Sequence, residues 1–215
     1  MSGAGDANAG ARSALGRVEA TLRDVVRYTP SGDTIPEETW RSRHRNIVLI
    51  LLAHVPLLLV LGLYEGTESV TGARIPATPQ WLIALELGIL LGFVGLSVVP
   101  QFPRRARTAL ASTGLLASSV VLVQFSGGYI EAHFHFFVAM AAIAAYEDWL
   151  PFALGLVYVV STHGVFGMIN PERVYNHAAA IANPWIWGLI HGVFVLGLAA
   201  SLMSHWYSTE KSREQ

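Results

Sequence analysis

The chain contains no cysteine among its 215 residues. That absence excludes disulfides, zinc–thiolate sites, iron–sulfur clusters and thiol nucleophiles. A bound metal ion must therefore be held by histidine, carboxylate, methionine, tyrosine or backbone oxygen. Charge is also scarce, because Asp, Glu, Lys and Arg make up 13% of the chain, whereas soluble domains carry about 25%. Residues 1–11 lack an apolar stretch, so they are not a secretory signal peptide.

Apolar residues take the place of the missing charges and make up 53% of the chain. They gather in runs that approach the length of about 20 residues that a helix needs to cross a bilayer. The predicted fold class is therefore all-α: a polytopic membrane protein with a bundle of six transmembrane helices. The predicted spans are approximately 46–64, 80–99, 108–125, 130–147, 150–169 and 184–203.

The rest of the chain divides into short segments around the membrane domain, which we place at 46–205. Residues 1–11 are predicted to be a disordered tail rich in Gly and Ala. Residues 12–28 are predicted to form an amphipathic helix that lies on the membrane surface, contacts a partner or packs on the protein's own cytoplasmic side. Residues 29–45 form a linker, and 206–215 form a cytoplasmic tail.

Basic residues near the ends of the spans predict the orientation, because cytoplasmic loops carry an excess of Lys and Arg. They cluster before the first span, between the second and third, and after the last, at Arg41, Arg43, Arg45, Arg104, Arg105, Arg107, Lys211 and Arg213. Both termini are therefore predicted to be cytoplasmic, in a multi-pass protein of the plasma membrane whose main partner is the lipid bilayer. We expect no nucleic-acid partner. His44 and His205, near the inner ends, are expected to face solvent or headgroups.

Ionisable side chains occur inside the apolar runs, where each costs at least ~2–3 kcal/mol on insertion scales. They are His54, His133, His135, His163, His191 and Glu86. With ~1.5 Å of rise per residue, all of them fall in the outer half of the bilayer or near its midplane. Histidines that only fill a core would not be expected to gather at one depth. We therefore predict that they converge on a shared guest.

The start of the fourth span carries three of the candidate groups. Glu131 and His135 are four residues apart and so share one helical face. They are predicted to supply two ligands, or a ligand and the group that orients it. His133 points elsewhere in this prediction, toward a neighbouring helix or the interface.

The outer loop before the sixth span, residues 170–183, holds Tyr175, Asn176 and His177. We expect it to fold over the histidines as a lid that supplies supporting groups, with His177 as an additional ligand or proton carrier. Asn183 and Pro184 predict the start of the sixth helix, because proline is favoured at the first helical position. Asp148 is predicted to cap the fifth helix.

Several motifs occur together over residues 40–205. They are His54-Val-Pro56, Gly127-Gly-Tyr-Ile-Glu-Ala-His-Phe-His-Phe-Phe-Val138, Tyr146-Glu-Asp-Trp-Leu-Pro-Phe152, His163-Gly164, Tyr175-Asn-His177, Asn183-Pro-Trp185 and Ile190-His191. In them the chain resembles a membrane input region of prokaryotic signalling proteins that precedes methyl-accepting, histidine-kinase or diguanylate-cyclase modules. The family often has a histidine pair where this chain has Thr162 and His163, so one ligand is absent. Only about ten residues follow the last span, so the resemblance implies a stand-alone sensor that signals through a separate cytoplasmic protein.

The leading hypothesis is a membrane-embedded module that binds a transition metal, copper, iron or zinc, through His135, His163 and His191, with His54, His133 and Glu131 as further ligands. Glu86, His177, Tyr175 and Asn176 are the expected supporting groups. Haem b is the alternative cofactor, held by two of His54, His163 and His191, in a slot lined by Gly155, Gly164, Gly188 and Gly192. The module is expected to sense a metal, redox state or a small gas, and to form a homo-oligomer.

Two other functions stay open from the sequence. A small membrane oxidoreductase or metal-dependent hydrolase would use the same histidines, with Glu131 as the base and an open coordination position beside a substrate cavity. A proton or ion transporter would use Glu86, His54 and the outer histidines as a relay. The nearly apolar inner halves of the spans disfavour the transporter.

Overall fold

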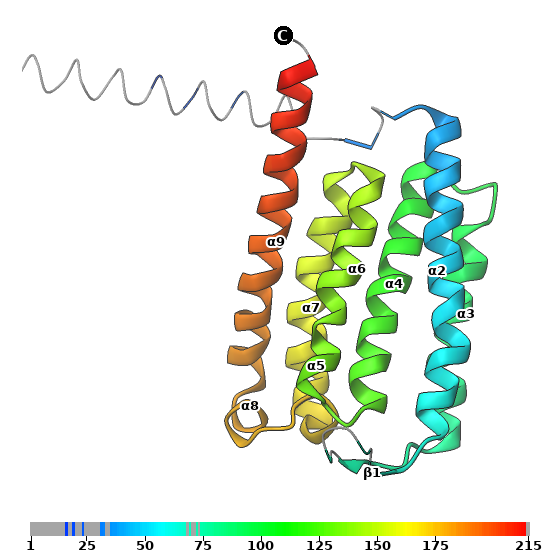
Figure 1. Ribbon diagram of the computed structural model, residues 1–215, viewed down its shortest axis with the longest axis vertical. Coiled ribbons are helices and arrows are strands. Elements are labelled where there is room, and N and C mark those ends of the chain that lie inside the picture. The colour runs from blue at the N-terminus through cyan, green and yellow to red at the C-terminus, as the bar shows by residue number, and fades with distance from the viewer. Residues whose placement is uncertain are drawn as a thin grey trace, which may run out of the picture.

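The computed structural model in Figure 1 describes residues 16, 19, 23, 31, 32, 35–67, 69, 72 and 74–213. The predicted tail at 1–11 lies outside the described residues. So does most of the amphipathic helix predicted at 12–28, of which only Gly16, Glu19 and Arg23 are described, all three as helical.

Five helices of the described chain are long and apolar enough to cross a membrane. Their bounds are α2 Glu37–Leu63, α3 Gln80–Ser97, α4 Arg104–Phe125, α7 Trp149–Ile169 and α9 Pro184–Arg213. They correspond to five of the six predicted spans, with ends that differ by one or two residues at Leu63 and Ser97. The first and last helices are longer than predicted, because helical structure continues into polar sequence at Glu37 and up to Arg213, where hydropathy no longer marks it.

The predicted fourth span is not one continuous helix. It comprises α5 (Ile130–His133), α6 (His135–Ile143) and a 3₁₀ turn, η1 (Ala144–Tyr146). The chain tightens at Phe134, where the amide N–H groups of Phe134 and Phe137 donate to the carbonyl oxygens three residues earlier. The apolar stretch Ile130–Tyr146 is shorter than the other five helices, so the prediction of one regular helix at 130–147 is wrong in detail.

Local capping explains where two of the helices begin. The side chain of Asp148 accepts a hydrogen bond from the backbone N–H of Leu150 at 2.9 Å, which confirms the predicted cap of α7. The preceding residue, Glu147, adopts a left-handed conformation with φ 49°, which turns the chain from η1 into α7. Helix α9 begins at Pro184, as predicted.

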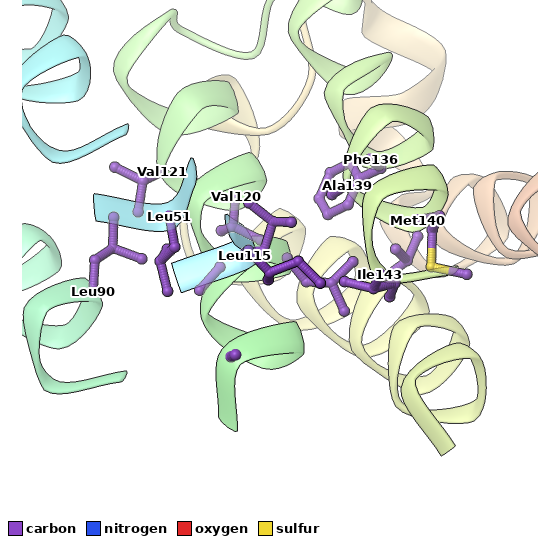
Figure 2. Packing of buried hydrophobic residues seen from close by; sticks show 14 of the residues in the cluster. Leu51, Leu90, Leu115, Val120, Val121, Phe136, Ala139, Met140 and Ile143 are labelled. Carbon is purple, nitrogen blue, oxygen red and sulfur yellow. The ribbon is translucent and has the colours of Figure 1, made fainter. Parts of the chain in front are cut away.

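Helix α4 lies at the centre of the bundle and packs against α2, α3, α6 and α7. Of the 18 residues in its most apolar stretch, 72% are buried inside the protein, compared with 22–33% in the other long helices. Figure 2 shows Leu115 and Val120 of α4 between Leu51 and Leu90 on one side and Met140 on the other. Helix α9 packs along α7 at the edge of the bundle.

The two ends of the bundle differ in kind (Figure 1). One end, which we call the hairpin end, carries the β1–β2 hairpin (Gly66–Thr67 and Arg74–Ile75), the start of α5, a 3₁₀ turn η2 (Pro171–Arg173) and the short helix α8 (Ala178–Ala182). The other end carries the start of α2, the α3–α4 connection and the end of α9 (Figure 1). The arginines of the α2 and α4 starts therefore share one end of the molecule.

His44 lies near that second end and is buried, with 3% of its surface exposed, so the expectation that it faces solvent or headgroups is wrong. Its Nδ1 lies 2.7 Å from the hydroxyl of Tyr146, and its Nε2 lies 3.0 Å from the carbonyl oxygen of Ser97. Its ring also stacks on Trp40. The side chain ties α2 to α3 and η1. His205 is exposed, as expected.

Candidate metal centre

Three histidines from three different helices converge near the hairpin end of the bundle. They are His133 of α5, His163 of α7 and His191 of α9, and one ring nitrogen from each lies within 4.8 Å of the other two. The ring centroids are 4.6 to 5.2 Å apart. His133 and His163 are buried and His191 is half-buried. We call these three residues the histidine cluster.

Each imidazole of the cluster is oriented by its own helix. Nδ1 of His133, His163 and His191 lies 3.0, 2.8 and 2.7 Å from the backbone carbonyl oxygen four residues earlier. A carbonyl can only accept, so in each neutral ring Nδ1 carries the proton and Nε2 is left as a lone pair. Nε2 of His133 and of His163 is buried with no hydrogen-bond partner in the described chain. The cluster therefore contains Nε2 atoms that can accept a hydrogen bond or bind a metal ion, and the described residues supply no hydrogen-bond donor to those of His133 and His163.

Glycine brings α7 and α9 close enough for their histidines to meet. A Cβ at Gly188 would lie 3.1 Å from the carbonyl oxygen of Val160 and 3.3 Å from Cβ of His163. A Cβ at Gly164 would overlap the ring of Trp185. Helices that lack side chains at the contact can approach more closely, as in other membrane bundles. The position of His191 against His163 thus depends on Gly164 and Gly188, which contribute no ligand atoms but allow the two helices to approach.

Tyr175 covers the cluster from the loop between α7 and α9, where a lid was predicted. Its ring centroid lies 6.1 to 6.4 Å from those of the three histidines, and its ring is nearly parallel to that of His133. Its hydroxyl donates to the carbonyl oxygens of Pro184 at 3.0 Å and His163 at 3.3 Å. Burial raises the pKa of this phenol, so the hydroxyl stays a donor at neutral pH.

The other predicted supporting residues lie farther from the cluster. Nδ1 of His177 accepts from the backbone N–H of Ala180 and caps α8, and its ring packs edge-on against Trp187. The side chains of Asn176 and Glu131 are exposed. The predicted ligand Glu131 is therefore not part of the histidine cluster.

His54 and His135, both predicted as ligands, form a separate pair. Nε2 of His54 lies 2.9 Å from Nε2 of His135, and Nδ1 of His135 lies 2.8 Å from the hydroxyl of Ser119. The structure thus puts His133, rather than His135, beside His163 and His191. His133 and His135 are two residues apart and cannot face the same way, and Tyr129, four residues before His133, supplies the carbonyl that orients the ring.

Glu86 was predicted to support the same site, but it lines a different cavity, between α3, α4 and α7. The space beside the four glycines that were predicted to line a haem slot is filled by neighbouring side chains and backbone. Besides the two contacts above, Gly155 faces the sulfur of Met140, and Gly192 faces the side chain of Val160. The expected roomy slot at these positions is therefore not present.

The cluster combines two buried imidazoles and one half-buried imidazole, each held by a backbone carbonyl at Nδ1 and covered on one side by the ring of Tyr175. Such an arrangement suits a divalent transition metal, because neutral imidazole nitrogen is a favoured ligand and a hydrogen bond at the second nitrogen orients it. A void of about 10 Å³ borders His163, Phe136 and Thr162, which is space for about one water molecule.

No family model matches the chain, and no solved structure matches it. Among curated proteins, the chain is similar to Transducer protein Htr8 from Halobacterium salinarum (strain ATCC 29341 / DSM 671 / R1). The two are 68% identical over 206 residues, which cover 95% of this chain and 32% of that protein. The chain therefore spans about a third of the length of the curated relative that it matches. The five apolar helices and the transducer relative indicate a membrane protein. The relative is also consistent with the sensory type of protein that the motifs predict.

Proposed function

We propose that the chain is the membrane input region of a sensory transducer, and that His133, His163 and His191 bind a transition metal ion. The observation that carries the proposal is the convergence of three imidazoles whose Nδ1 atoms are each engaged by a backbone carbonyl. Nε2 of each ring is then the nitrogen left to coordinate, and one ring nitrogen from each histidine lies within 4.8 Å of those of the other two. A metal ion satisfies all three at once.

The chemistry favours zinc, copper or iron, because the ligand set is all imidazole nitrogen. Metal–nitrogen bonds of ~2.0–2.1 Å place the ligands of a tetrahedral ion about 3.3 Å apart. Small rotations of the three side chains reach that spacing from the observed 4.8 Å limit. Three protein ligands would leave the fourth position of a tetrahedral ion open to water or a small exogenous ligand.

Haem is the weaker alternative. Its iron takes axial ligands from opposite faces of a flat macrocycle, but the three imidazole rings of the cluster lie only 4.6 to 5.2 Å apart, centroid to centroid, which leaves too little space for a macrocycle between any two of them. The glycines that would open a slot for the ring already face Met140, Trp185 and Val160.

In the proposed orientation, the arginine-bearing end of the bundle is cytoplasmic and the histidine cluster lies in the outer half of the plasma membrane. The stretch Ile130–Tyr146 then serves as the fourth of six spans. Helix α9 connects the two regions, because it contains His191 and continues to Arg213, a distance of about 33 Å at 1.5 Å per residue. A shift of His191 on metal or ligand binding would move the cytoplasmic end of α9, where a signalling partner or a second copy would detect it.

Elemental analysis and an absorption spectrum of the purified protein test the proposal. We expect about one zinc, copper or iron per chain and no Soret band. His133→Ala and His163→Ala should each lower the metal content at least tenfold, because two remaining ligands hold an ion poorly.

His135→Ala is the matched control, since it removes a histidine two residues from His133 that belongs to the separate pair. It should keep the metal. A Soret band would replace the metal proposal with haem. Loss of metal in His135→Ala and its retention in His133→Ala would contradict the assignment of ligands.

A further inference from the structure

A cavity of about 460 Å³ lies between α3, α4 and α7, on the other side of α4 from the His54–His135 pair. Its walls are apolar and include Leu85, Ile89, Ala117, Val121 and Phe166. Trp81 and Arg173 lie at the end where the helices meet the loops. The volume falls within the range of cavities that hold small organic ligands.

One acidic side chain, Glu86, projects into this apolar space. It lies six residues after the start of α3, about 9 Å along the helix. Its Oε2 atom is buried and has no hydrogen-bond partner in the described part of the chain. A buried polar atom without a partner costs about 1–3 kcal/mol, and more if it is charged, so the cavity is built to receive a hydrogen-bond donor.

The nearest cation does not supply that donor. Arg173 directs its guanidinium to the hydroxyl of Thr78 and to the carbonyl oxygens of Ala77 and Gln124. It thereby fixes the η2 turn over the end of the cavity. The carboxyl group of Glu86 stays available to whatever enters between α3 and α7.

We propose that this cavity binds a lipid-soluble molecule with an apolar body and one hydrogen-bond donor, a hydroxyl or a protonated amine, which pairs with Glu86. The apolar walls hold the body by van der Waals packing, which favours a compact body that fits the space. The carboxyl group selects the polar end, because it accepts hydrogen bonds in either protonation state and repels an anion when ionised. The site is separate from the histidine cluster, so it stands or falls independently of metal binding.

A matched series of rigid probes tests the proposal: 1-adamantanol, 1-adamantylamine and adamantane-1-carboxylate. They share one apolar body and differ in the polar group. Titration calorimetry of the full chain in detergent should show saturable binding of the alcohol and the amine. The carboxylate should bind at least tenfold more weakly. Equal binding of all three, or no binding of any, would show that the cavity holds only lipid chains and would overturn the proposal.

Variants locate the binding to the cavity. Glu86→Leu should weaken the alcohol and the amine at least tenfold, while Glu86→Gln should retain the alcohol and lose the preference for the amine. Glu172→Gln, an exposed acidic residue of η2, should bind as the unmodified chain does. Ala117→Leu, which fills the cavity and leaves Glu86 in place, should block all probes, so the test remains decisive if Glu86→Leu does not fold. Undiminished binding in Ala117→Leu would overturn the proposal.

Discussion

Nε2 of His54 lies 2.9 Å from Nε2 of His135, and this contact joins α2 to α6. Nδ1 of His54 lies 2.7 Å from the carbonyl oxygen of Ile50 and must donate to it. In the neutral ring, Nε2 of His54 then accepts, and Nε2 of His135 donates. The hydroxyl of Ser119 completes the chain by donating to Nδ1 of His135. Every nitrogen of the pair is thus used in a hydrogen bond, unlike the nitrogens of the histidine cluster.

The His54–His135 pair is expected to stabilise the bundle. His135→Leu leaves Nε2 of His54 without a donor, so the free energy of unfolding should fall by about 1–3 kcal/mol. Adding His54→Leu should recover part of that loss, because it removes the unsatisfied group. Unfolding in mixed detergent measures both changes. His205→Leu, an exposed position, is the control, and strictly additive losses would contradict the pairing.

Close packing of α9 on α7 is expected to be sensitive to single methyl groups. Gly164→Ala places a Cβ against the ring of Trp185, and such overpacking costs about 1–3 kcal/mol. Gly197→Ala is the matched control, because a Cβ there meets nothing within 4 Å, and alanine is favoured over glycine in a helix. Thermal unfolding should show a lower midpoint for the first variant and an unchanged or higher one for the second. A Gly164→Ala protein as stable as the control would contradict this packing.

The turn between η1 and α7 is expected to prefer residues that tolerate a left-handed backbone. Glu147 has φ 49° and its carboxylate pairs with Nη1 of Arg43 at 2.6 Å. Glu147→Asn and Glu147→Val both remove the ion pair, but valine should cost about 1–2 kcal/mol more, because a β-branched residue is strained in this region. Unfolding free energies of the two variants measure the difference. Arg43→Gln removes the ion pair and also the hydrogen bond from Nη1 to the carbonyl oxygen of Ala145, so it should be at least as destabilising as Glu147→Asn, and a valine variant as stable as the asparagine variant would argue against the strained turn.

Tyr175 is expected to stabilise its loop through a neutral hydroxyl. Tyr175→Phe removes the hydrogen bonds to His163 and Pro184 and should lower stability by about 1 kcal/mol at pH 7.

The same hydroxyl has a pH signature. Because burial raises the pKa of Tyr175, its contribution is complete below the ordinary tyrosine pKa of about 10 and is lost as pH rises above that value. The unfolding midpoint of the unmodified chain should therefore fall more steeply above pH 10 than that of Tyr175→Phe. Tyr64→Phe, in an exposed loop position, serves as the control, and parallel curves for all three proteins would contradict the buried hydroxyl.

Hydropathy alone located the five long apolar helices, because helices that cross a membrane need long apolar runs whatever they contact. The predicted fourth span was harder, because the sequence at 130–147 is largely apolar while the backbone breaks at Phe134. Periodicity assumes a regular helix, so it paired Glu131 with His135, whereas the structure exposes Glu131 and turns His135 toward Ser119. The burial of His44 could not be predicted from local sequence either. Its ring packs on Trp40, one helical turn earlier, and its Nδ1 meets the hydroxyl of Tyr146, which is 102 residues away in the sequence.

The sequence by itself determined that this is a helical membrane protein and that helices begin at Asp148 and Pro184, because hydropathy and capping act locally along the chain. Only the tertiary structure decided which histidines meet. Their grouping depends on the rotation of each helix about its axis and on close approaches at Gly164 and Gly188. Those are properties of packed pairs of helices, and they join His133 with His163 and His191 while directing His135 to His54.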